Sequence, residues 1–214
     1  MKKEEVTQRK IAFSGAVRSV QPRSYVWRYR IDNRTHKMTG YHLFLTGTAE
    51  GIMKDFVVAI SEKQQEKWHF RIGDEIKGEA WTKKDEKKEY ADDYRAGSFR
   101  KTAEGTVQEN TREPWLDEVP DLCTYDLRGC RMLDKRAWKG KCFACKWACM
   151  ANVAIEYNFG VSRKYRFETF CYGPKNCRHY KMGKPRAVPY INKESSWDDG
   201  DLDDMCTWNR SDEE

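Results

Sequence analysis

Five of the eight cysteines fall within residues 141–180, in a pattern that suits metal binding. The clusters are Cys142-x2-Cys145-x3-Cys149 and Cys171-x5-Cys177. A tetrahedral ion such as Zn²⁺ needs soft ligands close together, and two thiolate pairs at the open end of a β-hairpin supply them. We therefore expect a zinc site with the ligands Cys142, Cys145, Cys171 and Cys177, with Cys149 as an alternative ligand and His179 in reserve.

Other uses of these thiols stay open. Three cysteines of the first cluster plus one distal cysteine could equally hold an iron–sulfur cluster. Buried thiols and disulfides are further alternatives. The chain begins MKKEEVTQRK with no apolar run behind it, so we expect no secretory signal and a cytoplasmic location. Cysteines in that compartment favour a metal over disulfides.

The segment between the two clusters alternates like a β-hairpin. Val153, Ile155 and Tyr157 fall on one face of the first arm, which is the period of a strand. The second arm spans 164–170, and the turn chemistry lies around Gly160. This hairpin brings the two cysteine clusters to one end.

The elements before the cysteines have the order of a small β-barrel. We expect a long strand over 11–31, bent at Gly15 and near Pro22, and further strands over 40–47 and 55–60. A short helix follows over 61–68, with Ser61 as its N-cap and Gln64 as the capping-box partner. A Gly73–Asp74 turn leads into a strand to Trp81, and the last strand is expected over 123–133. This order is that of the OB-fold, a five-stranded Greek-key barrel.

The predicted fold class is therefore mainly β, an OB-type barrel followed by a metal-bound, zinc-ribbon-like hairpin. The barrel is expected over residues 10–135 and includes a long flexible loop at 82–121. The cysteine ribbon follows over 136–182, and an extended acidic tail over 183–214.

The stretches FRIGDEIKG and RFETFCYGPKNC, the latter with a preceding CxxC, resemble OB-fold nucleic-acid-binding proteins that carry a zinc-ribbon-like cysteine module. The resemblance covers most of residues 10–182. It implies binding of nucleic acid by analogy of fold.

Charge agrees with a polyanionic partner. The net charge is +6, but the 4 basic and 9 acidic residues from Lys184 onward give −5, which leaves +11 for residues 1–183. The tail could compete with nucleic acid for the basic body, although a solubilising end is the plainer interpretation. No window approaches the roughly 18 apolar residues needed to span a membrane.

Basic and aromatic residues interleave on the first two strands, as a surface that stacks bases and meets phosphates requires. We expect Arg18, Arg28 and Arg30 to point outward together. The alternative is that Tyr25, Trp27 and Tyr29, which share one strand face, simply form the barrel core. The candidate nucleic-acid-binding residues are Arg18, Arg23, Trp27, Arg28, Arg30, Tyr41, Phe44 and Arg166.

No nucleotide-binding, hydrolase or metalloprotease motif is found, which favours a binding protein over an enzyme. The expected function is binding of single-stranded DNA or RNA. The alternatives are an adaptor that docks on a larger protein complex and an iron–sulfur protein.

Overall fold

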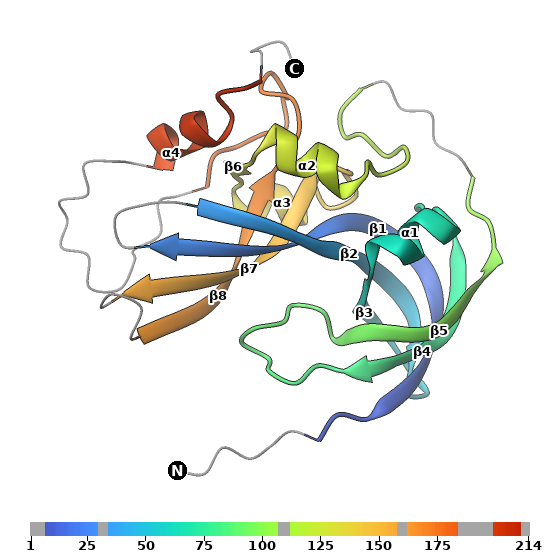
Figure 1. The fold of residues 1–214 in the computed structure, drawn as a ribbon. Helices are drawn as coiled ribbons and strands as arrows, with labels where there is room; N and C mark the ends of the chain where they lie inside the picture. The colour runs from blue at the N-terminus through green and yellow to red at the C-terminus, as the bar shows by residue number, and fades with distance from the viewer. Residues whose placement is uncertain (1–6, 30–33, 107–111, 158–161, 184–198, 211–214) are drawn as a thin grey trace.

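A computed structural model of the chain describes residues 7–29, 34–106, 112–157, 162–183 and 199–210 (Figure 1). These residues form a mainly β protein, as the sequence predicts. Its elements are β1 (Lys10–Tyr29), β2 (Arg34–Ala49), β3 (Ile52–Ile60), α1 (Glu62–Trp68), β4 (Glu75–Thr82), β5 (Asp93–Ala103), α2 (Leu122–Arg128), β6 (Arg131–Met132), α3 (Lys135–Lys139), β7 (Ala148–Tyr157), β8 (Ser162–Cys171) and α4 (Asp199–Cys206).

The strands belong to one mixed sheet, in the order β2-β3-β5-β4-β1-β7-β8-β6. The first part of β1 pairs with β4, whereas its residues 25–29 pair with β7, in parallel. Strand β1 also pairs with β2 along most of its length. The cysteine hairpin is therefore a continuation of the same sheet (Figure 1), which differs from the expected separation of barrel and ribbon.

Irregularities in β1 let one strand serve both parts of this sheet. The pairing with β2 shifts between Val17 and Ser19 and again between Pro22 and Ser24, and such bulges bend and twist a strand. The predicted bend near Pro22 is confirmed. The strands approach closely at Gly15 and Gly47, where a Cβ on Gly47 would lie 2.4 Å from the Gly15 Cα. Only glycine fits there.

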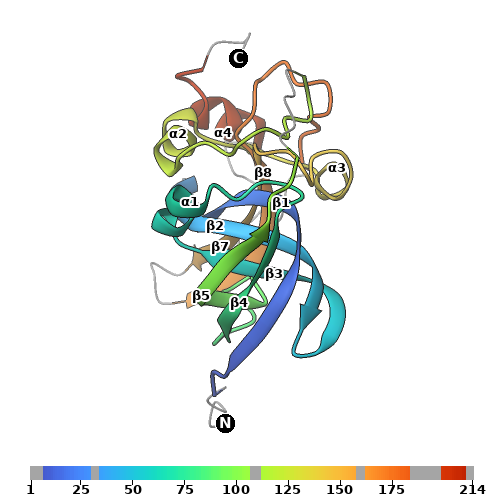
Figure 2. The same cartoon turned by 90° about the vertical axis from the view of Figure 1, so that its right-hand side faces the viewer.

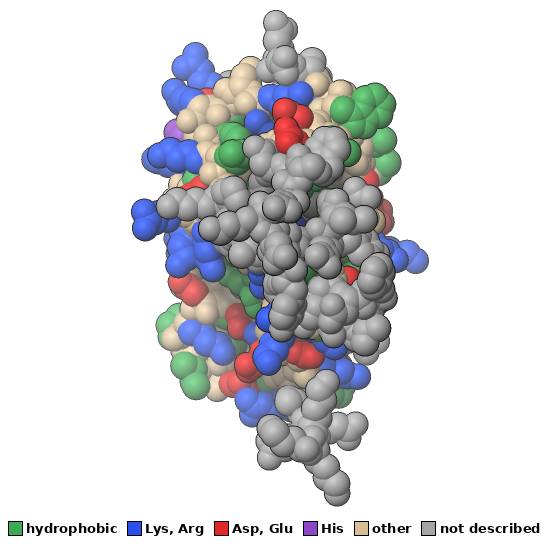
Figure 3. All heavy atoms as spheres, turned by 90° about the vertical axis from the view of Figure 1, so that its left-hand side faces the viewer, with side chains coloured by type: hydrophobic (Ala, Val, Ile, Leu, Met, Phe, Trp, Pro, Cys, Tyr) green, Lys and Arg blue, Asp and Glu red, His purple; other side chains and the backbone are tan. Residues whose placement is uncertain are grey.

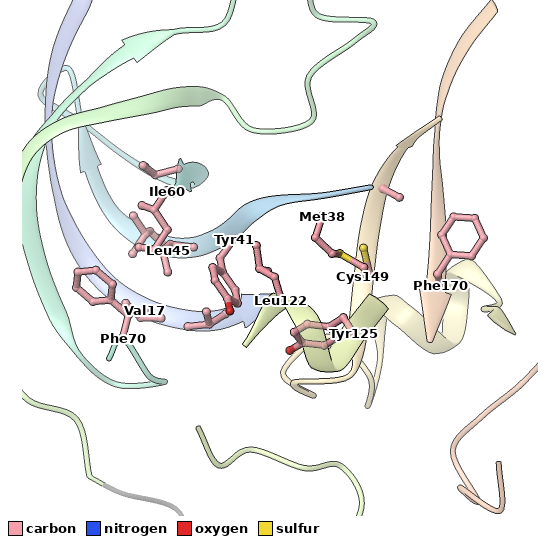
Figure 4. Packing of buried hydrophobic residues seen from close by; sticks show 14 of the residues in the cluster. Val17, Met38, Tyr41, Leu45, Ile60, Phe70, Leu122, Tyr125, Cys149 and Phe170 are labelled. Carbon is pink, nitrogen blue, oxygen red and sulfur yellow. The ribbon is translucent and has the colours of Figure 1, made fainter. Parts of the chain in front are cut away.

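Two clusters of buried residues lie on the two sides of β2. Leu43 and Leu45 join the larger cluster, which continues past Tyr41 to Cys149 and Phe170 of the hairpin (Figure 4). Phe44 belongs to the second cluster, together with Trp138 and the cysteines at 142, 145 and 171. The cysteine module, which we define as residues 129–183, thus contributes to both clusters: its hairpin residues Cys149 and Phe170 join the larger core, and the turn with Cys142 and Cys145 packs on the other side of β2.

Helix α1 begins as the sequence predicts. The Ser61 hydroxyl accepts from the Gln64 backbone N–H at 3.3 Å, and the Gln64 side-chain oxygen accepts from the Ser61 N–H at 2.8 Å. This reciprocal pair is a capping box. The cysteine hairpin is confirmed as β7 and β8, while its turn at 158–161 lies outside the described residues.

The strand expected over residues 123–133 is wrong. Residues 123–133 hold helix α2 and the short β6, whereas the additional long strand, β5, lies inside the expected loop at 82–121. Asp121 starts α2, because its carboxylate accepts from the Thr124 N–H at 2.8 Å. Leu122 and Tyr125 are buried at the spacing of a helix.

The described end of the tail is docked, which corrects the expected extended tail. Asp203 of α4 accepts from the Met132 N–H at 2.8 Å and from the Tyr180 hydroxyl at 3.1 Å. The Arg210 guanidinium donates to the carbonyls of Tyr172 at 3.1 Å and Gly129 at 3.4 Å. Among the described residues, no helix is long and apolar enough to cross a membrane.

Candidate functional site

Two turns of the cysteine module carry the four predicted ligands. Cys142 and Cys145 lie in the turn after α3, where the Cys145 N–H donates to the Cys142 carbonyl at 3.1 Å. Cys171 ends β8, and Cys177 lies in the following turn, where its carbonyl accepts from the Tyr180 N–H at 3.1 Å. The thiols at 142, 145 and 171 are buried, and Cys177 is half-buried.

The predicted ligand thiols affect one another's pKa values. Burial raises the pKa of Cys142 to about 12, with further contributions from Cys171 and Cys177. Burial likewise raises the pKa of Cys145 to about 12, and Cys171 and Cys142 add to the shift. Ionising these thiols together is therefore costly unless a cation sits among them, and a bound divalent metal supplies that charge.

Backbone N–H groups already point at two of the sulfurs. The Gly173 N–H donates to the Cys171 Sγ at 3.4 Å, and the Trp147 N–H makes the equivalent bond to the Cys145 thiol. Each donor is two residues beyond its cysteine. Hydrogen bonds of this kind favour the thiolate and fix the direction of the sulfur, as around a metal.

The ligand shell is nevertheless not assembled. Among the described residues, no group of three or more His, Cys, Asp or Glu side chains is arranged to hold a metal ion. Zinc at these four cysteines therefore stays a prediction. His179 faces Cys142 through its backbone, since the Cys142 thiol lies 3.9 Å from the His179 carbonyl oxygen.

Cys149, the alternative ligand, lies in the other core. Its thiol donates to the Pro22 carbonyl at 3.3 Å, among the residues of the larger cluster. Cys130 is also buried, and its sulfur lies 2.8 Å from the Nε2 of His36. Both are packed away from the turns that hold the four predicted ligands.

The expected nucleic-acid face is largely buried. The exposed fraction is 2% for Tyr41, 5% for Phe44 and 6% for Arg28. Arg28 does not point outward, because its Nη1 lies 3.3 Å from both carboxylate oxygens of Glu168. The Tyr41 hydroxyl donates to the Pro120 carbonyl at 2.8 Å. Tyr41 and Phe44 are therefore core residues, and Arg28 forms a buried ion pair.

The other candidates are dispersed. Arg166 pairs with Glu168, and Arg23 pairs with the carboxylate of Glu89. Arg18 is exposed and donates to the Thr46 hydroxyl at 3.2 Å. Trp27 is half-buried, with its ring 4.4 Å from that of Tyr25, and Arg30 lies outside the described residues. The structure therefore does not bring these residues together on one open surface.

The cysteine module itself covers the outer side of β2. The Phe143 carbonyl accepts from the Ser19 hydroxyl at 2.7 Å and from the Gln21 amide at 2.6 Å. The Phe143 ring lies 5.1 Å from that of Phe44, edge to face, and Trp138 lies 5.9 Å from the same ring. Side chains of the module therefore cover Phe44, one of the predicted nucleic-acid-binding residues.

Sequence reasoning missed where the positive charge is concentrated. The cysteine module contains 12 basic and 3 acidic residues, a net +9, so the rest of the chain carries −3. Counting the charge of residues 129–183 separately, rather than comparing residues 1–183 with the tail, would have located this positive charge. Figure 2 shows α3 on the side of the molecule opposite α2. On that side, at the upper left of Figure 3, Lys and Arg side chains gather, whereas basic and acidic ones mix in the lower part.

Comparison with protein-family models, curated proteins and solved structures found no match to this chain.

Proposed function

We propose that the chain is a single-stranded nucleic-acid-binding protein built on an OB-type barrel, with a structural metal centre in its cysteine module. The strand pairings support the barrel. They run from β1 through β2, β3, β5 and β4 back to β1, and α1 lies between β3 and β4. That connectivity is the one expected of an OB-fold.

The observation that carries nucleic-acid binding is the net positive charge of the module. Of its three acids, Glu156 and Glu168 are buried, and Asp134 caps α3 with its carboxylate. The surface of the module is therefore basic, although the chain as a whole carries only +6. A basic surface binds a polyanion by releasing its counterions.

The metal would have a structural role. Zinc held by Cys142, Cys145, Cys171 and Cys177 joins the turn after α3 to the turn after β8. Since Phe143 lies between two of these ligands and packs on Phe44, the metal also holds the module against β2. An iron–sulfur cluster is the alternative occupant. Reduced thiols suit a cytoplasmic protein.

The test is a titration of the purified chain into a fluorescein-labelled single-stranded 20-mer, as DNA and as RNA, followed by anisotropy. The expected result is saturable binding. The logarithm of the association constant should fall linearly with the logarithm of salt concentration between about 50 and 200 mM. No binding to either strand at about 50 mM salt contradicts the proposal. It would favour the adaptor, for which the β2–β3 hairpin offers Ile52 and Met53, 63% and 73% exposed.

A further inference from the structure

Two sets of basic residues can be distinguished in the cysteine module. One set is engaged: Arg163 pairs with Glu156 at 2.6 Å, and Arg178 pairs with Glu113 at 3.1 Å. Lys146 contacts Asp117, and Arg131 donates to the Pro174 carbonyl at 2.8 Å. The second set is exposed and makes no ion pair with any described residue. It consists of Lys135, Arg136, Lys139, Lys141 and Lys181, which we call the basic edge.

The members of the basic edge are neighbours. Three of them lie on α3, and Lys141 follows in the next turn. Lys181 joins them from the end of the module, because its carbonyl accepts from the Asp134 N–H at 2.8 Å at the start of α3. Five positive charges thus lie along one short helix and the chain beside it.

The adjacent acid, Asp134, offsets only part of this charge, because it is a single carboxylate that interacts with Arg136 and Lys181 while it caps the helix. The Asp134 carboxylate accepts from the N–H groups of Arg136 at 2.8 Å and Ala137 at 3.0 Å, so its hydrogen bonds go to the helix N-terminus. Trp138 is buried and anchors the opposite side of α3, since its indole N–H donates to the Gln21 side chain at 3.2 Å. The helix is therefore fixed with its cations facing outward.

We propose that the basic edge is the surface that binds the sugar–phosphate backbone of a single-stranded nucleic acid. This inference rests on the proposed function. It places the nucleic-acid contact on the cysteine module instead of on strands β1 and β2. Exposed ammonium and guanidinium groups are the donors that phosphate oxygens accept from, and such contacts position a strand without reading its sequence. Binding should therefore depend strongly on salt and weakly on base composition.

Two matched variants of the full chain test this placement. In the first, Lys135, Arg136, Lys139 and Lys141 are each replaced by Gln, which keeps helix propensity while removing four charges. In the control, four exposed barrel cations, Lys63, Lys77, Lys84 and Arg100, are replaced by Gln. Both variants lose three lysines and one arginine, so their net charge is identical.

We expect the basic-edge variant to bind the labelled 20-mer at least about tenfold more weakly at 100 mM salt, and its salt slope to fall by about 2 to 3. The control should change affinity by less than about threefold. Equal losses of affinity in both variants would overturn the inference, because binding would then depend on net charge and not on this edge. Failure of the unmodified chain to bind would instead contradict the proposed function itself. Tighter binding to polyglutamate or to phosphatidylserine vesicles than to the 20-mer would overturn the nucleic-acid assignment of this edge.

Discussion

At the scale of single residues, Cys171 is the predicted metal ligand whose surroundings are best defined. Its sulfur is buried at the end of β8 and accepts a backbone N–H bond from Gly173. We predict that Cys171→Ser or Cys177→Ser releases zinc and destabilises the module, because binding energy is folding energy at a structural site. Metal content per chain after dialysis, measured by atomic emission, checks this.

Two other cysteines serve as controls for the metal prediction. Cys123 is exposed on α2, and Cys149 is buried in the larger core. Cys123→Ser should change neither metal content nor stability. Cys149→Ala should cost about 1 kcal/mol through lost packing, yet retain the metal. Unchanged metal content in the Cys171 and Cys177 variants would exclude this ligand set.

Arg28 is expected to affect stability rather than binding. Its guanidinium lies against the carboxylate of Glu168, which is fully buried and also pairs with Arg166. We predict that Arg28→Ala lowers the free energy of unfolding by about 3 kcal/mol, since removing one partner weakens the compensation of a buried charge. Urea denaturation measures this.

The matched control for Arg28 is Arg18→Ala, on the same strand but exposed, which should change stability by less than about 0.5 kcal/mol. A full-stability Arg28→Ala variant with weakened oligonucleotide binding would restore the original assignment of this residue.

At the scale of elements, the loop between β4 and β5 is held by one buried acid. Glu89 pairs with Arg23 of β1, and its Oε1 lies 3.6 Å from the Nε2 of His42 on β2. Burial alone raises the pKa of Glu89, but His42 and Arg23 more than offset this and lower it to about 2. The next residue, Tyr90, packs against Phe44 and Trp138. Glu89 therefore ties the loop to the second core.

Acid should release this loop. Because the folded-state pKa of Glu89 lies below its ordinary value of 4.5, its stabilisation is present above about pH 5 and is lost as pH falls toward 2. The loss is up to about 3 kcal/mol. We predict that Glu89→Gln, compared with the unmodified chain by urea denaturation at pH 7 and pH 3, is less stable at pH 7 and loses less on acidification. Parallel pH profiles of the two proteins would contradict this role.

Local patterns explain which elements the sequence predicts. The Ser61–Gln64 capping box and the alternation of β7 each act within a few residues, so they are visible in the chain alone. Strand β5 was missed because it lies in a polar segment, with several exposed side chains, and exists through pairing with β4 and β3. Helix α2 was read at the period of a strand, although Leu122 and Tyr125 fall on one helical face.

At the scale of the whole molecule, the sequence did not predict that the cysteine module packs against strands β1 and β2. Phe44 and Arg28 were correctly recognised as residues of adjacent strands, yet their neighbours come from the cysteine module more than 90 positions away: Phe143 for one and Glu168 for the other. No local pattern encodes such a contact. The same packing that buries these side chains leaves the cations of α3 facing outward, so the fold itself determines which charges are accessible.

The acidic end of the chain also acts at this scale. Helix α4 and the residues just after it dock on the module through Asp203 and Arg210, which are buried, whereas Asp201 and Asp204 are exposed. If the tail competes with nucleic acid, removing exposed acids should tighten binding about tenfold. We predict instead that the double variant Asp201→Asn, Asp204→Asn binds the oligonucleotide less than about threefold more tightly at about 50 mM salt. Helix α4 packs on β6, so its acids act on the basic edge only through solvent, where salt screens them.

Deleting residues 184–214 should act mainly on stability. The deletion removes the Asp203 acceptor from the Met132 N–H and the Arg210 donor from the Tyr172 carbonyl, so groups buried in the complete chain lose their partners. We expect the free energy of unfolding to fall by about 2 kcal/mol or more. Urea denaturation measures this loss, and oligonucleotide affinity is followed in parallel. A stable truncated chain that binds tenfold more tightly would show that the tail is a competitor and that its docking contributes little to the fold.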